Sequence, residues 1–310
     1  MYFLFSVLTG AFIAIMIVAN GELASTYGVY SSTAVIHLIG LIFVIVFYAF
    51  NKQPKQSKKR LPFYFYLGGL LGVGTVVFNS MAFGKISVSA ILALGLLGQS
   101  VTAIIIDHFG WFKMPKVAFS KKKLIGLTFV FIGIFIMVAL REAKKGMAIT
   151  VALLTGLTVV ISRTLNARLA QETSMMKSTL FNYIIGFGSA VVIMIVAGGR
   201  ESMLNDFTLS SNVWIYTGGL IGVFAIMILN ITVTKISSFY LTLLLFIGQV
   251  FSGIVIDVLL TESFSMNNLI GGILVTIGLT INVWLDKKTQ NKSVNIKAKS
   301  YNSDYVVVKG

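Results

Sequence analysis

The stretch Lys85–Asp107 reads KISVSAILALGLLGQSVTAIIID, and it returns at Lys235–Asp257 as KISSFYLTLLLFIGQVFSGIVID. The two windows align without a gap at an offset of 150, and nine of their 23 positions are identical. The apolar middle of each window can cross a bilayer, since a spanning helix needs about 20 residues. Each window also carries a glutamine, Gln99 or Gln249, at the same depth. A duplicated span with a duplicated amide predicts a membrane protein with a repeated internal polar feature.

Composition agrees with a membrane protein. Of the 310 residues, 56% are hydrophobic and only 11% are charged, and the mean hydropathy is +0.91, whereas soluble domains carry about 25% charged residues. The apolar runs are continuous and do not alternate, which favours helices over a β-barrel. The net charge of +15 would suggest a nucleic acid partner in a soluble protein. Here the basic residues lie between apolar runs, so we expect them to set membrane topology and expect no nucleic acid binding.

Ten apolar runs predict ten transmembrane helices. They cover approximately residues 2–20, 30–50, 62–83, 87–106, 123–140, 147–167, 179–198, 212–232, 237–256 and 268–285. With the N-terminus in the cytoplasm, twenty Lys and Arg residues fall on the cytoplasmic side and five on the other. Because basic residues accumulate in cytoplasmic loops, this split predicts that both termini are cytoplasmic. The first run lacks a preceding basic region, so we expect it to be retained as a span.

The repeat extends over nearly the whole chain. Asn20–Ala24 (NGELA) matches Asn166–Ala170 (NARLA) at an offset of 146, and Tyr66–Val73 matches Tyr216–Val223 at an offset of 150. Each unit therefore holds five spans. Because five is odd, the second unit enters the membrane from the opposite side, which is an arrangement used by many secondary transporters.

The expected fold class is therefore an all-α membrane protein of ten transmembrane helices, arranged as two inverted five-helix repeats. The first repeat covers residues 1–141 and the second covers residues 142–285. Residues 286–310 form a polar tail without apolar periodicity, which we expect to be cytoplasmic and disordered.

Several motifs resemble those of a known family. Asn-x-x-Leu-Ala at the end of the first span, Gly-Gly-x-x-Gly in the third, Gly-Gln in the fourth and IIDHFG at residues 105–110 look like the YdcZ-type inner-membrane exporters of the drug/metabolite transporter superfamily. The resemblance covers about residues 1–285 and suggests the fused, two-unit form. The second unit departs from it, because Val-Leu-Leu follows Asp257 where the first unit has His-Phe-Gly.

The resemblance implies a small-solute carrier in the cytoplasmic membrane. It also implies a cavity between the first to fourth and the sixth to ninth spans, with the fifth and tenth spans at the periphery.

Gln99 and Gln249 are the first candidates for solute contact, since they lie about 12–14 residues into their spans. An amide at this depth must find partners, because hydrocarbon offers none. Either the pair faces a central cavity and binds solute from both units, or each glutamine ties its span to a neighbouring helix.

Asn20 and Asn166 form a second matched pair, followed two places on by Glu22 and Arg168. One explanation is that they act as outer and inner gate charges, with Glu22 attracting cations. The other is that they are interfacial residues at helix ends. We assign Arg168 to the second explanation, because it obeys the positive-inside rule, and leave Glu22 open.

His37 and Tyr183 are equivalent at an offset of 146. With the span boundaries predicted above, His37 is the only titratable side chain well inside a span, which makes it a candidate for proton coupling or solute contact. The alternative is a neutral histidine bonded to a backbone carbonyl or a hydroxyl. Tyr240 lies a turn inside the ninth span, and with Tyr183 it would offer aromatic faces to a cationic amine.

Other polar residues in or near the spans have ordinary explanations. Asp107 and Asp257 end their spans, where Asp is common, and Arg163 lies near the inner end of the sixth span, from which its side chain would reach the membrane surface. The amides that could either line a cavity or join helices are Asn79, Asn182 and Asn230.

Several kinds of chemistry have no support in the sequence. Cysteine is absent, which excludes disulfides and thiolate sites. The chain has no P-loop motif and no His/Asp/Glu cluster with metal-ligand spacing. Its two histidines, His37 and His108, complete no readable Ser-His-Asp set. We therefore expect no enzyme activity, no metal and no cofactor.

These observations predict a secondary transporter that exports a small organic solute or metabolite by alternating access. The expected partners are that solute, membrane lipid and protons as a coupling ion, and the chain would be a monomer or a homodimer. A lipid-linked substrate flippase and a non-transporting membrane subunit are the alternatives. The expected solute-binding residues are Asn20, Glu22, His37, Gln99, Asn166, Tyr183, Tyr240 and Gln249.

Overall fold

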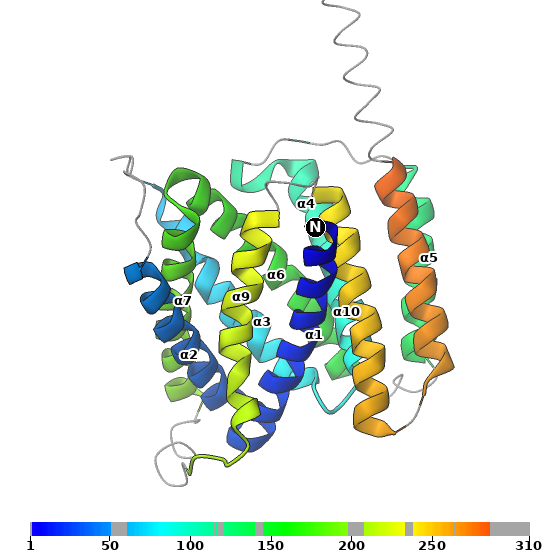
Figure 1. The fold of residues 1–310 in the computed structure, drawn as a ribbon. Helices are drawn as coiled ribbons and strands as arrows, with labels where there is room; N and C mark the ends of the chain where they lie inside the picture. Colours follow the sequence, from blue (N-terminus) through cyan, green and yellow to red (C-terminus); the bar gives the residue numbers. More distant parts are fainter. Residues whose placement is uncertain are drawn as a thin grey trace, which may run out of the picture.

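The computed structural model describes residues 2–50, 61–113, 116, 121–139, 145–197, 208–232, 238–262 and 264–285. Regular structure in these ranges is entirely helical, with ten α-helices and three short 3-10 helices (Figure 1). The α-helices are α1 (Tyr2–Tyr27), α2 (Val29–Phe50), α3 (Gly68–Ala82), α4 (Val88–Phe109), α5 (Lys123–Ala139), α6 (Gly146–Glu172), α7 (Met175–Val196), α9 (Gly218–Thr232), α10 (Ser238–Thr261) and an unlabelled last helix, Met266–Leu285. The 3-10 helices are η1 (Phe63–Leu67), η2 (Trp111–Lys113) and η3 (Val213–Thr217). The predicted tail, residues 286–310, lies outside the described residues.

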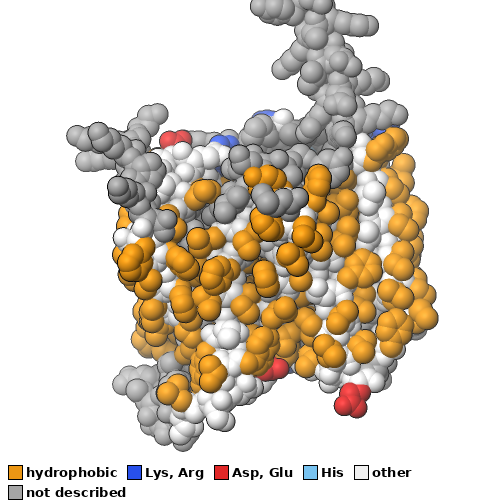
Figure 2. Space-filling view, in the orientation of Figure 1, with side chains coloured by type: hydrophobic (Ala, Val, Ile, Leu, Met, Phe, Trp, Pro, Cys, Tyr) orange, Lys and Arg blue, Asp and Glu red, His pale blue; other side chains and the backbone are white. Residues whose placement is uncertain are grey.

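Helices of this length and composition can cross a membrane. In the described part of the chain, eight are long and apolar enough to do so, and two shorter apolar segments lie at Leu124–Val138 and Val213–Leu229. Figure 2 shows hydrophobic side chains over the sides of the bundle, with the visible charged side chains near its two ends. An apolar belt between charged rims is the surface that lipid requires. The predicted all-α membrane fold is therefore confirmed.

The first span of each repeat, α1 or α6, is longer than its apolar run predicts, because backbone geometry rather than apolarity ends it. α1 continues past residue 20 to Tyr27 and stops at Gly28, which has a φ of +80°. This conformation is one that glycine adopts without a steric penalty. α6 continues past residue 167 to Glu172, and α7 then starts after Ser174, whose hydroxyl accepts a hydrogen bond from Lys177 N at 3.1 Å.

The helices pack in corresponding pairs. α1 contacts α10 and α9, and its repeat equivalent α6 contacts α4 and α3. The closest approaches involve equivalent glycines. A Cβ on Gly98 would lie 2.1 Å from the carbonyl oxygen of Leu153, and one on Gly248 would lie 2.0 Å from that of Val7. Only a residue without a side chain permits such close helix contact, as is common in membrane bundles.

α5 and the last helix lie together at one edge of the bundle (Figure 1). Their contact also uses glycines, since a Cβ on Gly126 would lie 2.4 Å from the carbonyl oxygen of Gly278, and one on Gly133 would lie 2.6 Å from that of Gly271. The start of α1 and the end of the last helix lie at the same end of the bundle (Figure 1). The other eight helices surround the centre.

Candidate functional site

A cavity of about 320 Å³ lies between α1–α4, α6, α7, α9 and α10. This volume is at the lower end of the range for small-molecule pockets. Neither α5 nor the last helix contributes to its lining. The polar lining residues are Asn20, His37, Thr75, Asn79, Gln99, Thr155, Ser162, Arg163, Asn166, Ser178, Thr179, Asn182, Tyr183 and Gln249.

Gln99 and Gln249 both line the cavity, on α4 and α10. Each follows directly after a glycine of a close helix crossing: Gly98 meets α6, and Gly248 meets α1. Within the described part of the chain, neither carboxamide makes a hydrogen bond to a neighbouring helix. The close helix crossings are therefore made by the glycines, and the amides lie beside them in the cavity wall.

Asn166 and Asn20 share a position in the fold but not the same hydrogen bonds. The Oδ1 of Asn166 packs against Gly68 and that of Asn20 against Gly218, so that a Cβ on either glycine would clash with it. Asn166 Nδ2 donates to Asn182 Oδ1 at 2.8 Å. Asn20 Oδ1 is buried and has no hydrogen-bond partner.

The rings of His37 and Tyr183 lie close together, with centroids 6.2 Å apart and an interplanar angle of 54°. His37 Nδ1 lies 2.8 Å from the carbonyl oxygen of Thr33. A carbonyl only accepts, so Nδ1 carries the proton and a neutral ring leaves Nε2 as an acceptor. No hydrogen bond is found for the Tyr183 hydroxyl among the described residues. The two rings therefore supply one acceptor and one hydroxyl to the cavity wall.

One predicted solute-binding residue, Glu22, is not among the described residues that line the cavity. Glu22 is half-buried, and its carboxylate accepts a hydrogen bond from Trp214 Nε1 at 2.8 Å. The side chains of Tyr240 and of Asn230 lie outside the described residues. Arg168, Glu22's equivalent, donates to Gln171 at 3.0 Å on the same helix, as an interfacial residue would.

The further amides Asn79 and Asn182 both line the cavity. Asn182 also joins helices, because its Oδ1 accepts the bond from Asn166. Asn79 Oδ1 is buried without a hydrogen-bond partner. From sequence spacing alone, an amide that lines a cavity could not be distinguished from one that joins two helices. Asn182 does both.

Arg163 also lines the cavity, a position that the sequence did not predict. Its side chain is exposed, and α6 runs nine residues beyond it, to Glu172, or about 14 Å at the rise of an α-helix. A signal was present in the repeat, because the equivalent position of the first unit is the apolar Ile17.

Asp257 is a buried helix cap. Its carboxylate accepts hydrogen bonds from Val88 N at 2.6 Å and from the Ser89 amide and hydroxyl at 3.0 and 2.5 Å. Asn268 Nδ2 supports the cluster by donating to the Ser89 hydroxyl at 2.9 Å. A carboxylate at a helix N-terminus satisfies orphan backbone donors and the helix dipole. Asp257 therefore ties the second half of the chain to the start of α4. The side chain of Asp107 lies outside the described residues.

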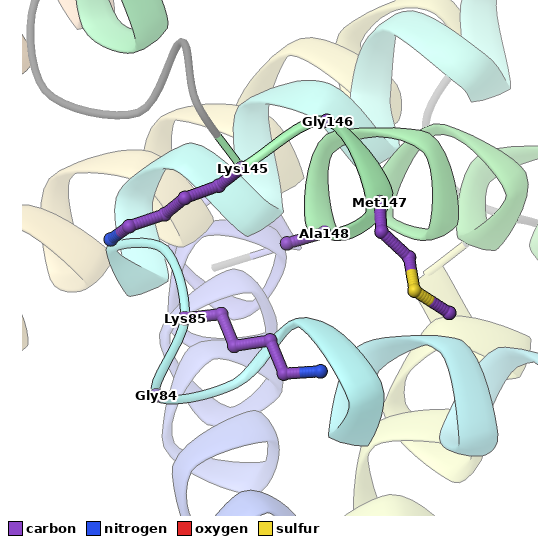
Figure 3. A pocket seen from close by; sticks show the side chains of 6 residues that line it. All are labelled: Gly84, Lys85, Lys145, Gly146, Met147 and Ala148. Atoms are coloured by element: carbon purple, nitrogen blue, oxygen red, sulfur yellow. The ribbon is translucent and has the colours of Figure 1, made fainter.

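A second depression, of about 310 Å³, lies on the surface where the α3–α4 turn meets the start of α6. Lys85 and Lys145 border it, but their amino groups point in opposite directions (Figure 3). They do not converge on a common ligand position. Among the described residues no three His, Asp or Glu side chains come close enough to hold a metal ion.

Comparison with known families agrees with this architecture. Residues 1–136 and 147–281 match the family described as "Putative inner membrane exporter, YdcZ". No curated protein matches the chain. The matched segments cover most of the chain, and their division into two agrees with a fused two-unit form. The chain therefore belongs to the YdcZ family of inner-membrane exporters and is a membrane transporter.

Proposed function

We propose that this protein is a secondary transporter that exports a small organic solute by alternating access. The observation that carries the proposal is the cavity, lined by polar and apolar side chains, between two sets of four helices with corresponding contacts. A site at the junction of two related units can open to either side when one unit rocks against the other. Membership in an exporter family supports export as the direction.

The two units of this proposal are inverted repeats, residues 1–141 and 142–285. Support comes from the duplicated sequence and from the equivalent glycine contacts of α4 with α6 and of α10 with α1. The distribution of Lys and Arg supports cytoplasmic termini.

Energy would come from a solute or ion gradient, because the sequence has no P-loop. Protons are the candidate coupling ion and His37 the candidate carrier, since it lines the cavity and imidazole titrates near neutral pH. A non-transporting subunit has no need of a polar central cavity. A lipid-linked flippase would require a lateral opening with a basic headgroup site.

The test replaces the paired amides. Gln99→Leu combined with Gln249→Leu should abolish transport, because it removes two polar groups from the cavity at nearly constant volume. A panel of amines, amino acids and carboxylates is first screened by thermal stabilisation of purified protein, and flux of each stabilising solute is then measured in proteoliposomes. The matched control is Thr102→Val with Ser252→Ala, which changes equivalent polar residues of the same two helices outside the lining.

Unchanged flux in the glutamine pair would remove these residues from the site. If wild-type protein carried none of the solutes that stabilise it, the transport function itself would be refuted. Gel filtration of each variant separates loss of function from loss of fold.

A further inference from the structure

The charge balance of the cavity is the starting point. Arg163 is the one charged side chain among the described residues that line it. The carboxylates with described side chains lie elsewhere: Glu22 accepts from Trp214, Asp257 caps α4, and the exposed Glu172 and Glu262 lie at helix ends outside the lining. No hydrogen bond or ion pair is found for the Arg163 guanidinium among the described residues. The cavity therefore carries a positive charge that these side chains do not compensate.

Arg163 lies within α6, with nine residues, or about 14 Å, of helix beyond it. An unpaired cation inside a membrane bundle costs several kcal/mol unless water or an anion solvates it. Such residues are rare and usually lie on a substrate pathway.

The chemistry of the Arg163 guanidinium indicates which class of ligand it would bind. A guanidinium presents a planar set of donors that matches a carboxylate in bidentate geometry, and it repels cations. The surrounding amides of Gln99 and Gln249 and the Tyr183 hydroxyl lack hydrogen-bond partners among the described residues. These groups would bind hydroxyls of a solute. One cation is balanced by one negative charge, which favours a monoanion over a dianionic phosphate ester.

We infer that the solute is a small, hydroxyl-bearing organic monoanion whose carboxylate binds Arg163. The inference rests on the proposed transport function and adds the substrate class. It differs from the cationic amine suggested by the tyrosines in the sequence, because a cation would have to enter beside an uncompensated guanidinium.

The test uses solutes that share a six-carbon polyol skeleton and differ in charge. Gluconate is the monoanion, sorbitol the neutral member, glucamine the cation and sorbitol 6-phosphate the dianion. Binding to purified full-length protein is measured by thermal stabilisation and by calorimetry. Gluconate should bind tightest. In Arg163→Gln its affinity should fall roughly 10-fold or more, the lower range for loss of a hydrogen bond to a charged group.

Two further variants separate charge from structure. Arg163→Lys should retain much of the preference for gluconate over glucamine, because the charge is kept. Arg168→Gln is the matched control, the same substitution on the same helix at a residue outside the lining, and should leave the order of affinities unchanged.

The inference is overturned if glucamine binds more tightly than gluconate, if gluconate binds Arg163→Gln as well as wild type, or if gluconate does not bind at all. Transport would survive each of these results, since a neutral or cationic solute could still be carried. The transport proposal fails separately, when solutes that bind in the cavity do not cross the vesicle membrane.

Discussion

The α6–α7 wall of the cavity and the α1–α2 wall have the same place in the repeat but different hydrogen bonding. In the α6–α7 wall, Asn166 Nδ2 donates to Asn182 at 2.8 Å and to Ser162 at 3.4 Å. The Ser162 hydroxyl in turn donates to the carbonyl oxygen of Gly68 at 2.8 Å, which joins α6 to α3.

In the α1–α2 wall the asparagine is kept but its partners are not. Asn20 is equivalent to Asn166, whereas Met16 and Ile36 take the places of Ser162 and Asn182. The Asn20 carboxamide makes no hydrogen bond to the described residues. The comparison teaches that both repeats keep the close glycine contacts between helices, whereas the polar residues around the asparagine differ. The α6–α7 wall is joined by side-chain hydrogen bonds, and the described part of the α1–α2 wall has no equivalent of them.

The largest effect on stability is expected at the equivalent glycines that make close helix contacts in both repeats. Gly98→Ala and Gly248→Ala each place a Cβ about 2 Å from a backbone carbonyl oxygen, which cannot move aside as a side chain can. We expect each to lower the free energy of unfolding by about 3 kcal/mol, the upper range for overpacking. The measurement is unfolding in mixed detergent micelles.

Gly188→Ala is the control for these glycines, because a Cβ there meets nothing within 4 Å. It should be neutral or slightly stabilising, since alanine is the better helix former. If Gly98→Ala lowered the free energy of unfolding strongly and Gly248→Ala did not, the two repeats would not depend on the same glycine contact.

An intermediate and unequal effect is expected at the asparagines. Asn166→Ala removes bonds to two side chains and leaves Asn182 Oδ1 without its donor, so we expect a loss of about 2 kcal/mol. Asn20→Ala should cost less than about 1 kcal/mol, because its carboxamide makes no hydrogen bond to the described residues. Equal losses in the same unfolding assay would show that the walls do not differ in this way.

The smallest effect is expected from restoring a partner to Asn20. Ile36→Asn puts an amide at the position equivalent to Asn182 and removes apolar packing, since Ile36 is buried. A double-mutant cycle with Asn20→Ala removes the packing loss and isolates the new bond. We expect a favourable coupling of about 1 kcal/mol. Zero coupling would mean that the α1–α2 wall cannot adopt the geometry of the α6–α7 wall.

Much of this fold could be predicted from the sequence, because membrane spans depend on composition and length alone. The ten apolar runs correspond to ten helices in the described part of the chain. The ends of α1 and α6 could not be read in the same way, since a positive φ at Gly28 and a serine cap at Ser174 end one helix or start the next after the apolar run has stopped.

Only part of the candidate site could be predicted from the sequence. Gln99 and Gln249 were identifiable because both copies kept an amide at one depth, and both line the cavity. The sequence predicts that Glu22 lines the cavity, but its carboxylate accepts a hydrogen bond from Trp214 and it is not among the described lining residues. The sequence did not predict that Arg163 lines the cavity, as it does in the structure.

The sequence by itself determined the helical class, the number of spans and the duplication, since these follow from apolar length and from residues repeated along the chain. Only the tertiary structure decided which polar groups share the cavity. That choice depends on helix phase, on where each helix ends and on which residues of distant segments are close enough to hydrogen-bond. Asn20 and Asn166 illustrate the division, because the repeat identifies them as a pair and only their neighbours distinguish them.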